Sequence, residues 1–115
     1  MNLVYEQFEF LKDVAKLIKF IEKLCAKTPA NDAFTAGEMW RPEATQAWYV
    51  KMGLSGTMAS KHLRRLAIDL NYITGGKLKE VPVEVGAYWE SLNPKNVWGG
   101  RWKKPYDPGH FERRV

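Results

Sequence analysis

Apolar residues recur at intervals of three and four between residues 7 and 27, which is the spacing of one face of a helix. The residues on this stripe are Leu11, Val14, Leu17, Ile18, Ile21, Leu24 and Cys25. The other positions carry the charged residues Lys12, Asp13, Lys16, Lys19, Glu22 and Lys23. The pattern predicts an amphipathic helix over 7–27, ended by the segment 28–32. A basic amphipathic helix can bind a membrane surface, but we favour packing of the stripe into the core.

A short strand followed by a helix is predicted in the second quarter of the chain. Residues 33–40 can form the strand, which leads into Arg41. Pro42 suits the first position of a helix, where its missing N–H leaves no hydrogen bond unmade. We expect this helix to extend to about Met52, before a loop rich in glycine, serine and threonine. The residues expected to face inward are Ala44, Ala47, Trp48 and Met52.

Residues 66–73 alternate between large apolar side chains and smaller or polar ones, which predicts a strand. One face of the strand carries Leu66, Ile68, Leu70 and Tyr72. Asp69 lies on the other face, beside the small residue Ala67, and so points away from the apolar side. The pair Gly75-Gly76 predicts a turn at the end of the strand.

The C-terminal third predicts a helix, a loop and a final short strand. The helix covers 82–92 and is broken by Asn93-Pro94. Its apolar residues at helical spacing are Val85, Tyr88, Trp89 and Leu92. Residues 95–109 are expected to form a loop, and residues 110–115 suit a strand.

At 115 residues the chain predicts one domain with a sizeable core, over 1–115. A hydrophobic content of 45% with 27% charged residues is ordinary for a soluble globular protein. No stretch approaches the ~20 apolar residues that span a bilayer, so no stable membrane insertion is expected. The N-terminus lacks the features of a secretory signal, which predicts a protein made in the cytoplasm. The single cysteine, Cys25, excludes an intramolecular disulfide and makes a cysteine-based zinc site unfavourable.

The net charge of +5 and the isoelectric point of about 9.4 favour anionic partners. Nucleic acid, anionic lipid and an anionic wall polymer all fit this charge. The lysines and arginines are dispersed, without a block of five, so a nucleic-acid-binding arm is not indicated.

The chain has two histidines, and each has a carboxylate at short range. His62 is followed seven residues later by Asp69, and Asp107 precedes His110 in Asp-Pro-Gly-His. Proline and glycine at the central positions predict a type II turn, which brings its first and fourth residues within about 7 Å. In the strand that follows, Glu112 shares a face with His110 and can support it.

Two imidazoles and two carboxylates supply what a catalytic zinc site requires, with three ligands and one base. We expect His62 to lie in a loop rich in serine, threonine and methionine, from which its side chain can swing over the end of the Asp69 strand. Spacing alone leaves an alternative open, since Asp-Pro-Gly is an ordinary turn sequence and a lone histidine is more often a surface or core residue.

Family resemblance strengthens the metal interpretation. Residues 60–69, Ser-Lys-His-Leu-Arg-Arg-Leu-Ala-Ile-Asp, resemble the S-x-H-x-x-G-x-A-x-D motif of D-alanyl-D-alanine carboxypeptidase and VanX-like zinc metallopeptidases. Residues 107–112 are similar to their second motif, D/E-x-x-H-F-E. Residues 37–46 resemble the family's G-x-x-x-R-x-x-x-x-Q segment, and residues 89–102 resemble its W-x-x-L…W-G-G-x-W segment. These motifs occur in the family's order.

The resemblance implies a small α+β fold with helices packed on a short antiparallel sheet and zinc in a cleft, as in Hedgehog and D-Ala-D-Ala peptidases. It implies that His62, Asp69 and His110 bind Zn²⁺. It gives Asp107 the role of general base, Arg41 that of substrate or oxyanion clamp, and Ser60 a role in substrate binding. The family usually has glycine where this chain has Arg65, which predicts that the turn is made in another way.

The subgroup most similar in appearance is the single-domain phage endolysins of L-alanyl-D-glutamate peptidase type. The implied substrate is the stem peptide of peptidoglycan, reached from the host cytoplasm after holin-type release, and we expect a monomer. A D,D-carboxypeptidase or dipeptidase with the same zinc chemistry is the alternative enzyme, and a non-catalytic wall-binding module is the alternative of another class. Trp98 and Trp102 can line a substrate groove, but we favour packing; Trp40 has the same two interpretations.

Overall fold

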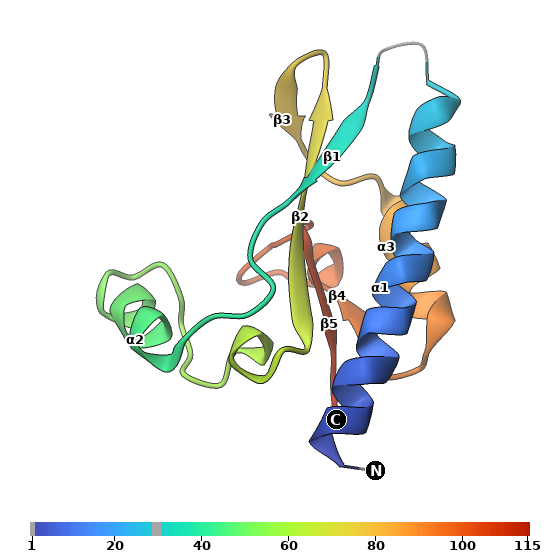
Figure 1. The fold of residues 1–115 in the computed structure, drawn as a ribbon. Helices are drawn as coiled ribbons and strands as arrows, with labels where there is room; N and C mark the ends of the chain where they lie inside the picture. Colours follow the sequence, from blue (N-terminus) through green and yellow to red (C-terminus); the bar gives the residue numbers. More distant parts are fainter. Residues whose placement is uncertain (1, 29–30) are drawn as a thin grey trace.

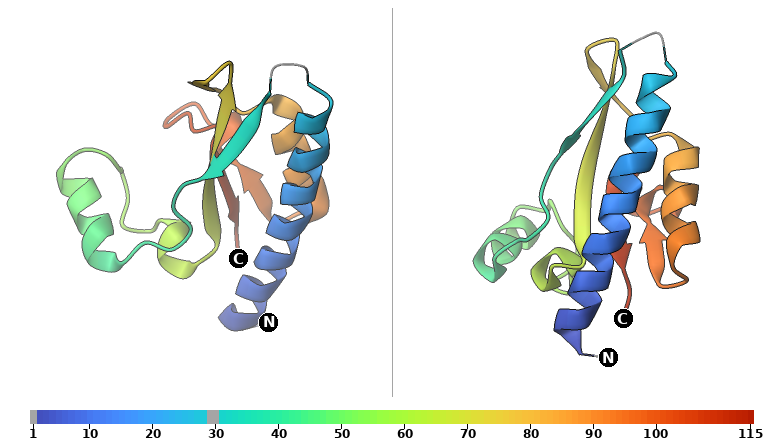
Figure 2. Two further views of the ribbon diagram at one scale, coloured as in Figure 1. Left: turned by 45° about the horizontal axis from the view of Figure 1, so that its top comes forward. Right: turned by 45° about the vertical axis from the view of Figure 1, so that its right-hand side comes forward.

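The computed structural model describes residues 2–28 and 31–115, which form a small α+β fold (Figure 1). Helices α1 and α3 lie on one side of an antiparallel sheet, and α2 lies apart from them (Figures 1 and 2). The helices are α1 (Leu3–Ala26), α2 (Glu43–Lys51), α3 (Val83–Leu92) and the 3₁₀ turns η1 (Lys61–Arg64) and η2 (Gly99–Arg101). The strands are β1 (Ala33–Ala36), β2 (Ala67–Thr74), β3 (Lys77–Lys79), β4 (Asn96–Trp98) and β5 (His110–Arg113). In this described part, none of the helices combines the length and hydrophobicity required to cross a membrane.

Strand β2 is the centre of the sheet. The strand order is β1-β2-β5-β4, every pairing is antiparallel, and β3 also pairs with β2. Strand β5 pairs with the first residues of β2, which places His110 opposite Asp69. The predicted alternation is confirmed: Leu66, Ile68 and Leu70 are buried in the core, while Asp69 lies on the other face.

Helix α1 begins four residues earlier than the predicted helix, because Asn2 caps it by accepting a hydrogen bond from the Tyr5 N–H at 3.0 Å. The predicted core packing is confirmed for most of the stripe, with Val14, Leu17 and Ile21 buried and Leu24 and Cys25 partly buried. It is wrong for Leu11 and Ile18, which are about half exposed. Of the segment predicted to end the helix, residues 29–30 lie outside the described residues.

The prediction for α2 located the helix but chose the wrong face. Trp48 and Met52 are more than half exposed, whereas the buried residue is Gln46. The amide of Gln46 accepts a hydrogen bond from Arg41 and donates to Ser55, so α2 is held by polar contacts rather than by apolar ones. Pro42 precedes the first helical residue and occupies the N-cap position.

The Gly75-Gly76 turn is confirmed, with both residues at positive φ, but it leads into a strand, β3, that the sequence pattern did not predict. Helix α3 is confirmed, with Val85 and Trp89 fully buried. The predicted loop 95–109 instead contains β4 and η2. Trp98 is buried there, and a Cβ atom on Gly86 would lie 2.0 Å from its ring, which confirms the packing interpretation of Trp98.

Candidate metal centre

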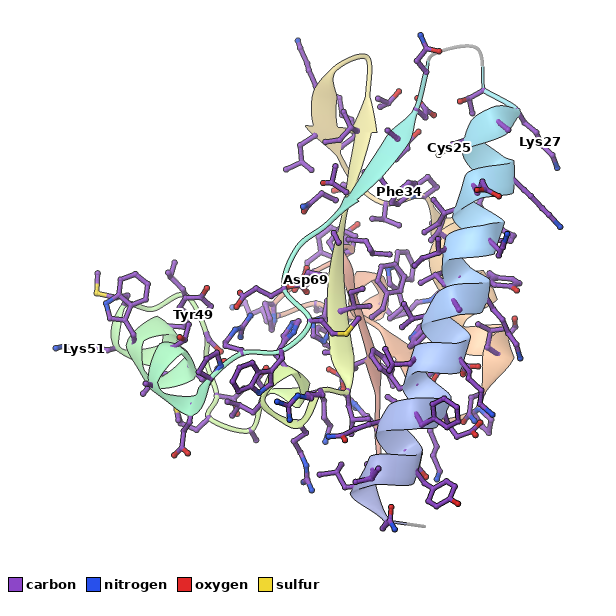
Figure 3. All side chains as sticks on the ribbon, viewed as in Figure 1. Cys25, Lys27, Phe34, Tyr49, Lys51 and Asp69 are labelled. Carbon is purple, nitrogen blue, oxygen red and sulfur yellow. The ribbon has the colours of Figure 1, made fainter. Side chains whose placement is uncertain are left out.

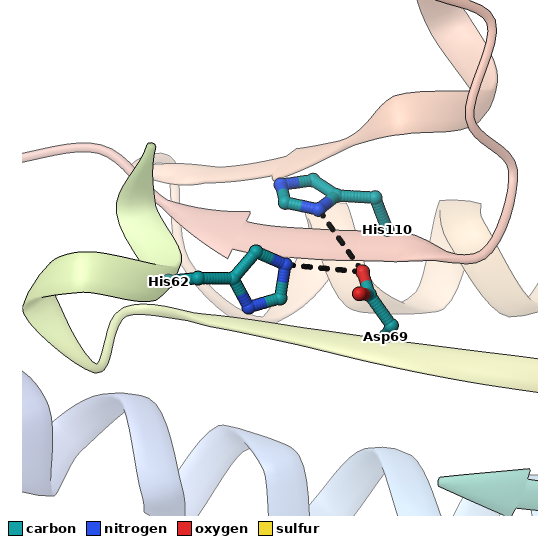
Figure 4. Close-up of side chains that lie close together, drawn as sticks. All are labelled: His62, Asp69 and His110. Carbon is teal, nitrogen blue, oxygen red and sulfur yellow. Dashed lines mark hydrogen bonds and ion pairs between the residues drawn. The ribbon is translucent and has the colours of Figure 1, made fainter. Parts of the chain in front are cut away.

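Three side chains from three separate elements converge on the face of the sheet opposite α1 (Figure 4). They are His62 from η1, Asp69 from β2 and His110 from β5, and we call them the His-Asp-His cluster. Asp69 Oδ1 lies 3.2 Å from His62 Nε2 and 3.2 Å from His110 Nδ1. One donor atom from each of the three residues lies within 4.8 Å of the others, close enough to hold a metal ion.

The position of His62 is fixed by the backbone around it. Ser60 caps η1, and its hydroxyl oxygen accepts a hydrogen bond from the His62 N–H at 3.2 Å. The ring is buried, and its Nδ1 lies 3.0 Å from the carbonyl oxygen of Met39. The expectation of a loop at His62 is therefore wrong, because the residue lies in a 3₁₀ turn and the Met39 contact orients its ring.

Arg65 directs the chain from η1 into β2. Its φ of 57° and ψ of 37° lie in the left-handed region that glycine adopts most readily. The expectation of a different turn at this position is wrong, since Arg65 adopts the conformation that suits the family's glycine. Its guanidinium lies 4.7 Å from the centre of the Trp40 ring, which is half exposed.

The turn before His110 closes through a hydrogen bond from the His110 N–H to the Asp107 carbonyl oxygen, at 3.1 Å. It is not the predicted type II turn, because Gly109 lacks the positive φ that such a turn requires. Glycine is needed at position 109 because the backbone of Leu70 lies very close to it. The Leu70 N–H donates to the Gly109 carbonyl oxygen at 2.8 Å, and a Cβ atom on Gly109 would lie 2.6 Å from the Leu70 oxygen.

The hydrogen-bond partners of the two histidines determine which ring nitrogen carries a proton. Nδ1 of His62 faces a carbonyl oxygen, and Nε2 of His110 lies 2.7 Å from a Glu112 carboxylate oxygen, so both of these nitrogens donate. In each neutral ring, the other nitrogen then directs its lone pair at Asp69. Three converging acceptors, two nitrogens and one oxygen, fit a cation such as Zn²⁺, and the outer contacts are those that orient metal-binding histidines.

The pKa values of Asp69 and His110 also indicate that the cluster favours a positive charge at its centre. Burial alone raises the pKa of Asp69, but hydrogen bonds from His110 and His62, which require a proton on the ring nitrogen that faces Asp69, outweigh it and lower this pKa to about 2. Burial alone lowers the pKa of His110, but Asp69 and Glu112 outweigh it and raise this pKa to about 9. The carboxylates thus favour a cation at this position, either a proton on His110 or a metal ion.

Asp107 lies half-buried beside the cluster. Burial and the negative charge of Asp69 raise the pKa of Asp107, against the opposing effect of His110. Asp107 also lines a groove of about 440 Å³, together with Asn71 and Lys79. Asp107 is therefore a carboxylate that lies near the cluster and also lines this groove.

Arg41 is linked to the cluster through the backbone, where its N–H donates to the His62 carbonyl oxygen at 3.2 Å. Its guanidinium is buried and donates to Glu38 at 3.1 and 3.3 Å and to Gln46 at 2.6 Å. The ring of Tyr49 lies 4.5 Å from it. Sequence reasoning gave no role to Glu38 or Gln46, although both lie in the segment 37–46 that resembles the family.

The same segment lies against Asp69. The Gly37 N–H donates to the Asp69 carbonyl oxygen at 2.7 Å, and the Asp69 N–H donates to the Glu38 carbonyl oxygen at 2.9 Å. A Cβ atom on Gly37 would lie 3.1 Å from the Asp69 Cβ atom, tighter than ordinary contact.

Trp102 also lies at the cluster, with its ring centre 5.1 Å from that of His110. The packing interpretation therefore describes Trp98, whereas Trp102 borders the site.

Comparisons with known proteins agree with this geometry. The family model described as D-alanyl-D-alanine carboxypeptidase matches residues 54–113, which include all three cluster residues and Asp107 but not Arg41. A search of curated proteins gave no significant match. Among solved structures, the crystal structure of Serratia marcescens L-Ala D-Glu endopeptidase ChiX has a similar fold. It matches with a TM-score of 0.60 and 23% identity over 87% of this chain and 79% of that chain. Because the family model covers more than half of the sequence, the chain belongs to the D-alanyl-D-alanine carboxypeptidase family of peptidases.

Proposed function

We propose that this protein is a zinc-dependent peptidase that hydrolyses peptide bonds in the stem peptides of peptidoglycan. The observation that carries the proposal is the arrangement of His62, Asp69 and His110, whose lone pairs converge while outer hydrogen bonds hold the rings. Membership of a peptidase family supports hydrolysis as the reaction. The fold is similar to that of an enzyme described as an L-Ala D-Glu endopeptidase, which supports this bond as the first to test.

We assign the three cluster residues to the metal. His62 would bind zinc through Nε2, His110 through Nδ1 and Asp69 through a carboxylate oxygen, the atoms that the outer hydrogen bonds leave free. When bound, zinc supplies a Lewis acid that polarises a carbonyl group and makes water more acidic. Glu112 would hold His110 in the required tautomer through the contact at 2.7 Å.

Asp107 is proposed as the general base. Its carboxylate oxygen would accept a proton from the attacking water and return it to the leaving amine. Its raised pKa makes it a better proton acceptor than an ordinary surface aspartate. Its position near the cluster and in the lining of the groove supports this role.

Arg41 is proposed as the clamp for the substrate carbonyl or a substrate carboxylate. An arginine guanidinium can stabilise negative charge that develops on a substrate oxygen. Glu38 and Gln46 hold the guanidinium by hydrogen bonds, so that a substrate would meet a fixed group. Ser60 is proposed to contact substrate as well as to cap η1, where its oxygen already accepts the His62 N–H.

The biological role that fits this activity is that of a phage endolysin which reaches the wall after release from the host cytoplasm. The basic charge of +5 would help a single-domain enzyme meet an anionic envelope. A D,D-carboxypeptidase is the second candidate, favoured by the description of the matching family. The two differ in the bond that is cut, because the carboxypeptidase releases single D-alanine.

Hydrolysis of purified peptidoglycan tests the proposal directly. The protein is assayed as prepared, after treatment with a zinc chelator, and after zinc is restored, and the products are identified by mass spectrometry. Chelator-sensitive release of stem peptides that begin at D-Glu, with L-Ala left on the glycan, is the expected result, while release of D-alanine would establish the carboxypeptidase. Absence of hydrolysis by protein with zinc confirmed bound would refute the proposed substrate.

A further inference from the structure

Helix α1 carries a second apolar stripe, on its exposed side, that the core does not use. Its residues are Val4, Phe8, Leu11 and Ile18, and each exposes between 48% and 71% of its surface. Their spacing of three, four and seven places them on one side of the helix. The buried face of the same helix, with Phe10, Val14, Leu17 and Ile21, points elsewhere. A contiguous exposed apolar stripe of this kind indicates an interaction surface.

Basic residues lie along both flanks of this stripe. Lys12, Lys16, Lys19 and Lys23 are exposed and follow the flank away from the core. On the other flank, the Gln7 side-chain amide donates to the carbonyl oxygen of Arg64 at 2.8 Å, which places η1 and its exposed arginine there. Of the four acidic residues of α1, Glu6 and Asp13 are buried, whereas Glu9 pairs with Lys12 at 2.8 Å and Glu22 is exposed. The four lysines outnumber these two surface carboxylates, so this side of the helix keeps a net positive charge.

We propose that the exposed face of α1, defined as the α1 patch by Val4, Phe8, Leu11, Ile18 and the four flanking lysines, docks reversibly on the surface of an anionic phospholipid bilayer. An apolar stripe bordered by lysines matches the two layers of a bilayer interface, where acyl chains take the apolar side chains and lipid phosphates take the charges. The helix is not apolar enough to span the bilayer, so it would lie in the plane of the interface.

Charge complementarity favours lipid over a second copy of this chain. Pairing of two α1 patches would bring two sets of lysines together, and like charges at short range oppose association. An anionic wall polymer or nucleic acid would satisfy the lysines but would leave the apolar side chains in water. The bilayer is the partner that uses both parts of the patch.

Docking through α1 would leave the candidate metal centre accessible. Helix α1 packs against the face of β2 that carries Ile68 and Leu70. Asp69 lies on the other side of β2 from α1 (Figure 3). A molecule bound through the α1 patch would therefore present the His-Asp-His cluster away from the bilayer. Docking of α1 on a bilayer would not require the proposed peptidase activity.

Cosedimentation of the full-length protein with vesicles tests the proposal. Vesicles of phosphatidylglycerol and phosphatidylcholine in equal parts are compared with vesicles of phosphatidylcholine alone, at low and at high salt. We expect binding to the anionic vesicles only. The double variants Leu11→Gln/Ile18→Gln and Lys16→Gln/Lys19→Gln should each weaken binding by about tenfold or more. Melting curves and hydrolysis of a soluble peptide should be unchanged, because these side chains are exposed and lie on the other side of the sheet from the cluster.

Matched controls separate the patch from general charge and hydrophobicity. Leu54→Gln/Met58→Gln removes two exposed apolar side chains elsewhere, and Lys51→Gln/Lys77→Gln removes two exposed lysines elsewhere. Both controls should bind as the unmodified protein does. Equal loss in the controls, absence of binding at low salt, or loss in the lysine variant alone would each overturn the proposal. A dimer that dissociates in Leu11→Gln/Ile18→Gln would also overturn it and would assign the patch to a second copy.

Discussion

Strand β5 separates two buried clusters of charged residues that differ in how their hydrogen-bond donors and acceptors are matched. On one face, His110 and Glu112 belong to the candidate metal centre. On the other face, Arg113 donates hydrogen bonds to Asp13 and to Asn96, with Glu6 at 3.9 Å. We call Glu6, Asp13, Asn96 and Arg113 the arginine cluster. It joins α1 to the back of the strand whose front carries His110.

The two clusters differ in how their groups match. In the arginine cluster, donors face acceptors: the Arg113 guanidinium meets Asp13, and the Asn96 amide donates to Asp13 and accepts from Arg113. In the His-Asp-His cluster, each histidine in its neutral form directs an acceptor at a carboxylate, so that a proton on His110 or a metal ion is required to balance the acceptors. A complete ion cluster contributes to the fold by itself, whereas converging acceptors require a cation. This difference, rather than burial or charge alone, distinguishes a candidate metal site from a structural salt bridge.

The largest effect is expected from His110→Ala, which removes one of the three converging donors. We expect loss of stoichiometric zinc, measured by elemental analysis, and loss of peptidase activity by at least about a thousandfold. Because the fold retains the arginine cluster, the metal-free variant should still melt cooperatively. Retention of both zinc and activity would show that the metal lies elsewhere.

Asp107→Asn tests the base without changing the size of the side chain. We expect the rate of hydrolysis to fall by about 10²–10⁴-fold while zinc content stays unchanged. The control is Glu80→Gln, which neutralises another carboxylate on the same groove and should leave the rate nearly unchanged. An Asp107→Asn enzyme with normal turnover would make the base assignment wrong.

Asp13→Ala disrupts the arginine cluster, and we expect it to lower the stability of the fold while zinc content is retained. Removing this carboxylate leaves the buried Arg113 without its closest partner, which we expect to cost about 3 kcal/mol of unfolding free energy. Zinc content of the folded protein should stay stoichiometric. Chemical denaturation measures the loss, and Glu9→Ala, at an exposed pair with Lys12, is the control that should change stability by less than about 0.5 kcal/mol. Loss of zinc at normal stability would reverse the roles of the two clusters.

Stability as a function of pH should also distinguish the clusters in zinc-free protein. The pKa of His110 is raised from 6.5 to about 9 in the folded state, so the stabilisation it gives is complete below pH 6.5 and is lost as pH rises through 9. We expect zinc-free protein to lose on the order of 2 kcal/mol over this range, measured by denaturation. His110→Ala should flatten the profile. Zinc binding should strengthen as pH rises, since the metal competes with this proton.

Much of this architecture could be predicted where one face of an element is buried. The alternation in β2 and the helical spacing in α3 predicted both elements, because their apolar faces meet the core. Spacing suggested that His62, Asp69 and His110 meet, and resemblance gave them a role. The antiparallel register that places Asp69 opposite His110 is the structural reason that they do meet.

Other features depend on contacts that no local pattern contains. The buried face of α2 is formed by Gln46, whose partners are polar, so hydrophobic spacing selected the wrong side. Strand β3 is exposed along its length and has no apolar face to predict it. The sequence suggested that Gly109 is a turn glycine, but glycine is required there because Leu70, 39 residues earlier in the chain, lies close to its backbone. Long-range polar contacts and backbone proximity were thus the parts that sequence alone could not supply.

The smallest expected effect concerns Arg65, which directs the chain from η1 into β2 and so helps to position His62. A non-glycine residue in the left-handed region costs about 1 kcal/mol relative to glycine. Arg65→Gly should therefore raise the unfolding free energy by up to about 1 kcal/mol, reduced by loss of the contact with Trp40. Arg65→Ala loses the same contact but keeps the backbone strain, so it should be less stable than Arg65→Gly and no more stable than the natural protein. Zinc affinity should be the same in all three, because His62 remains held by Ser60 and Met39. If Arg65→Gly instead weakened zinc binding, the rigidity of this turn would itself be part of the metal site. The His-Asp-His cluster would then depend on the backbone at Arg65 as well as on a cation, whereas the arginine cluster depends on neither.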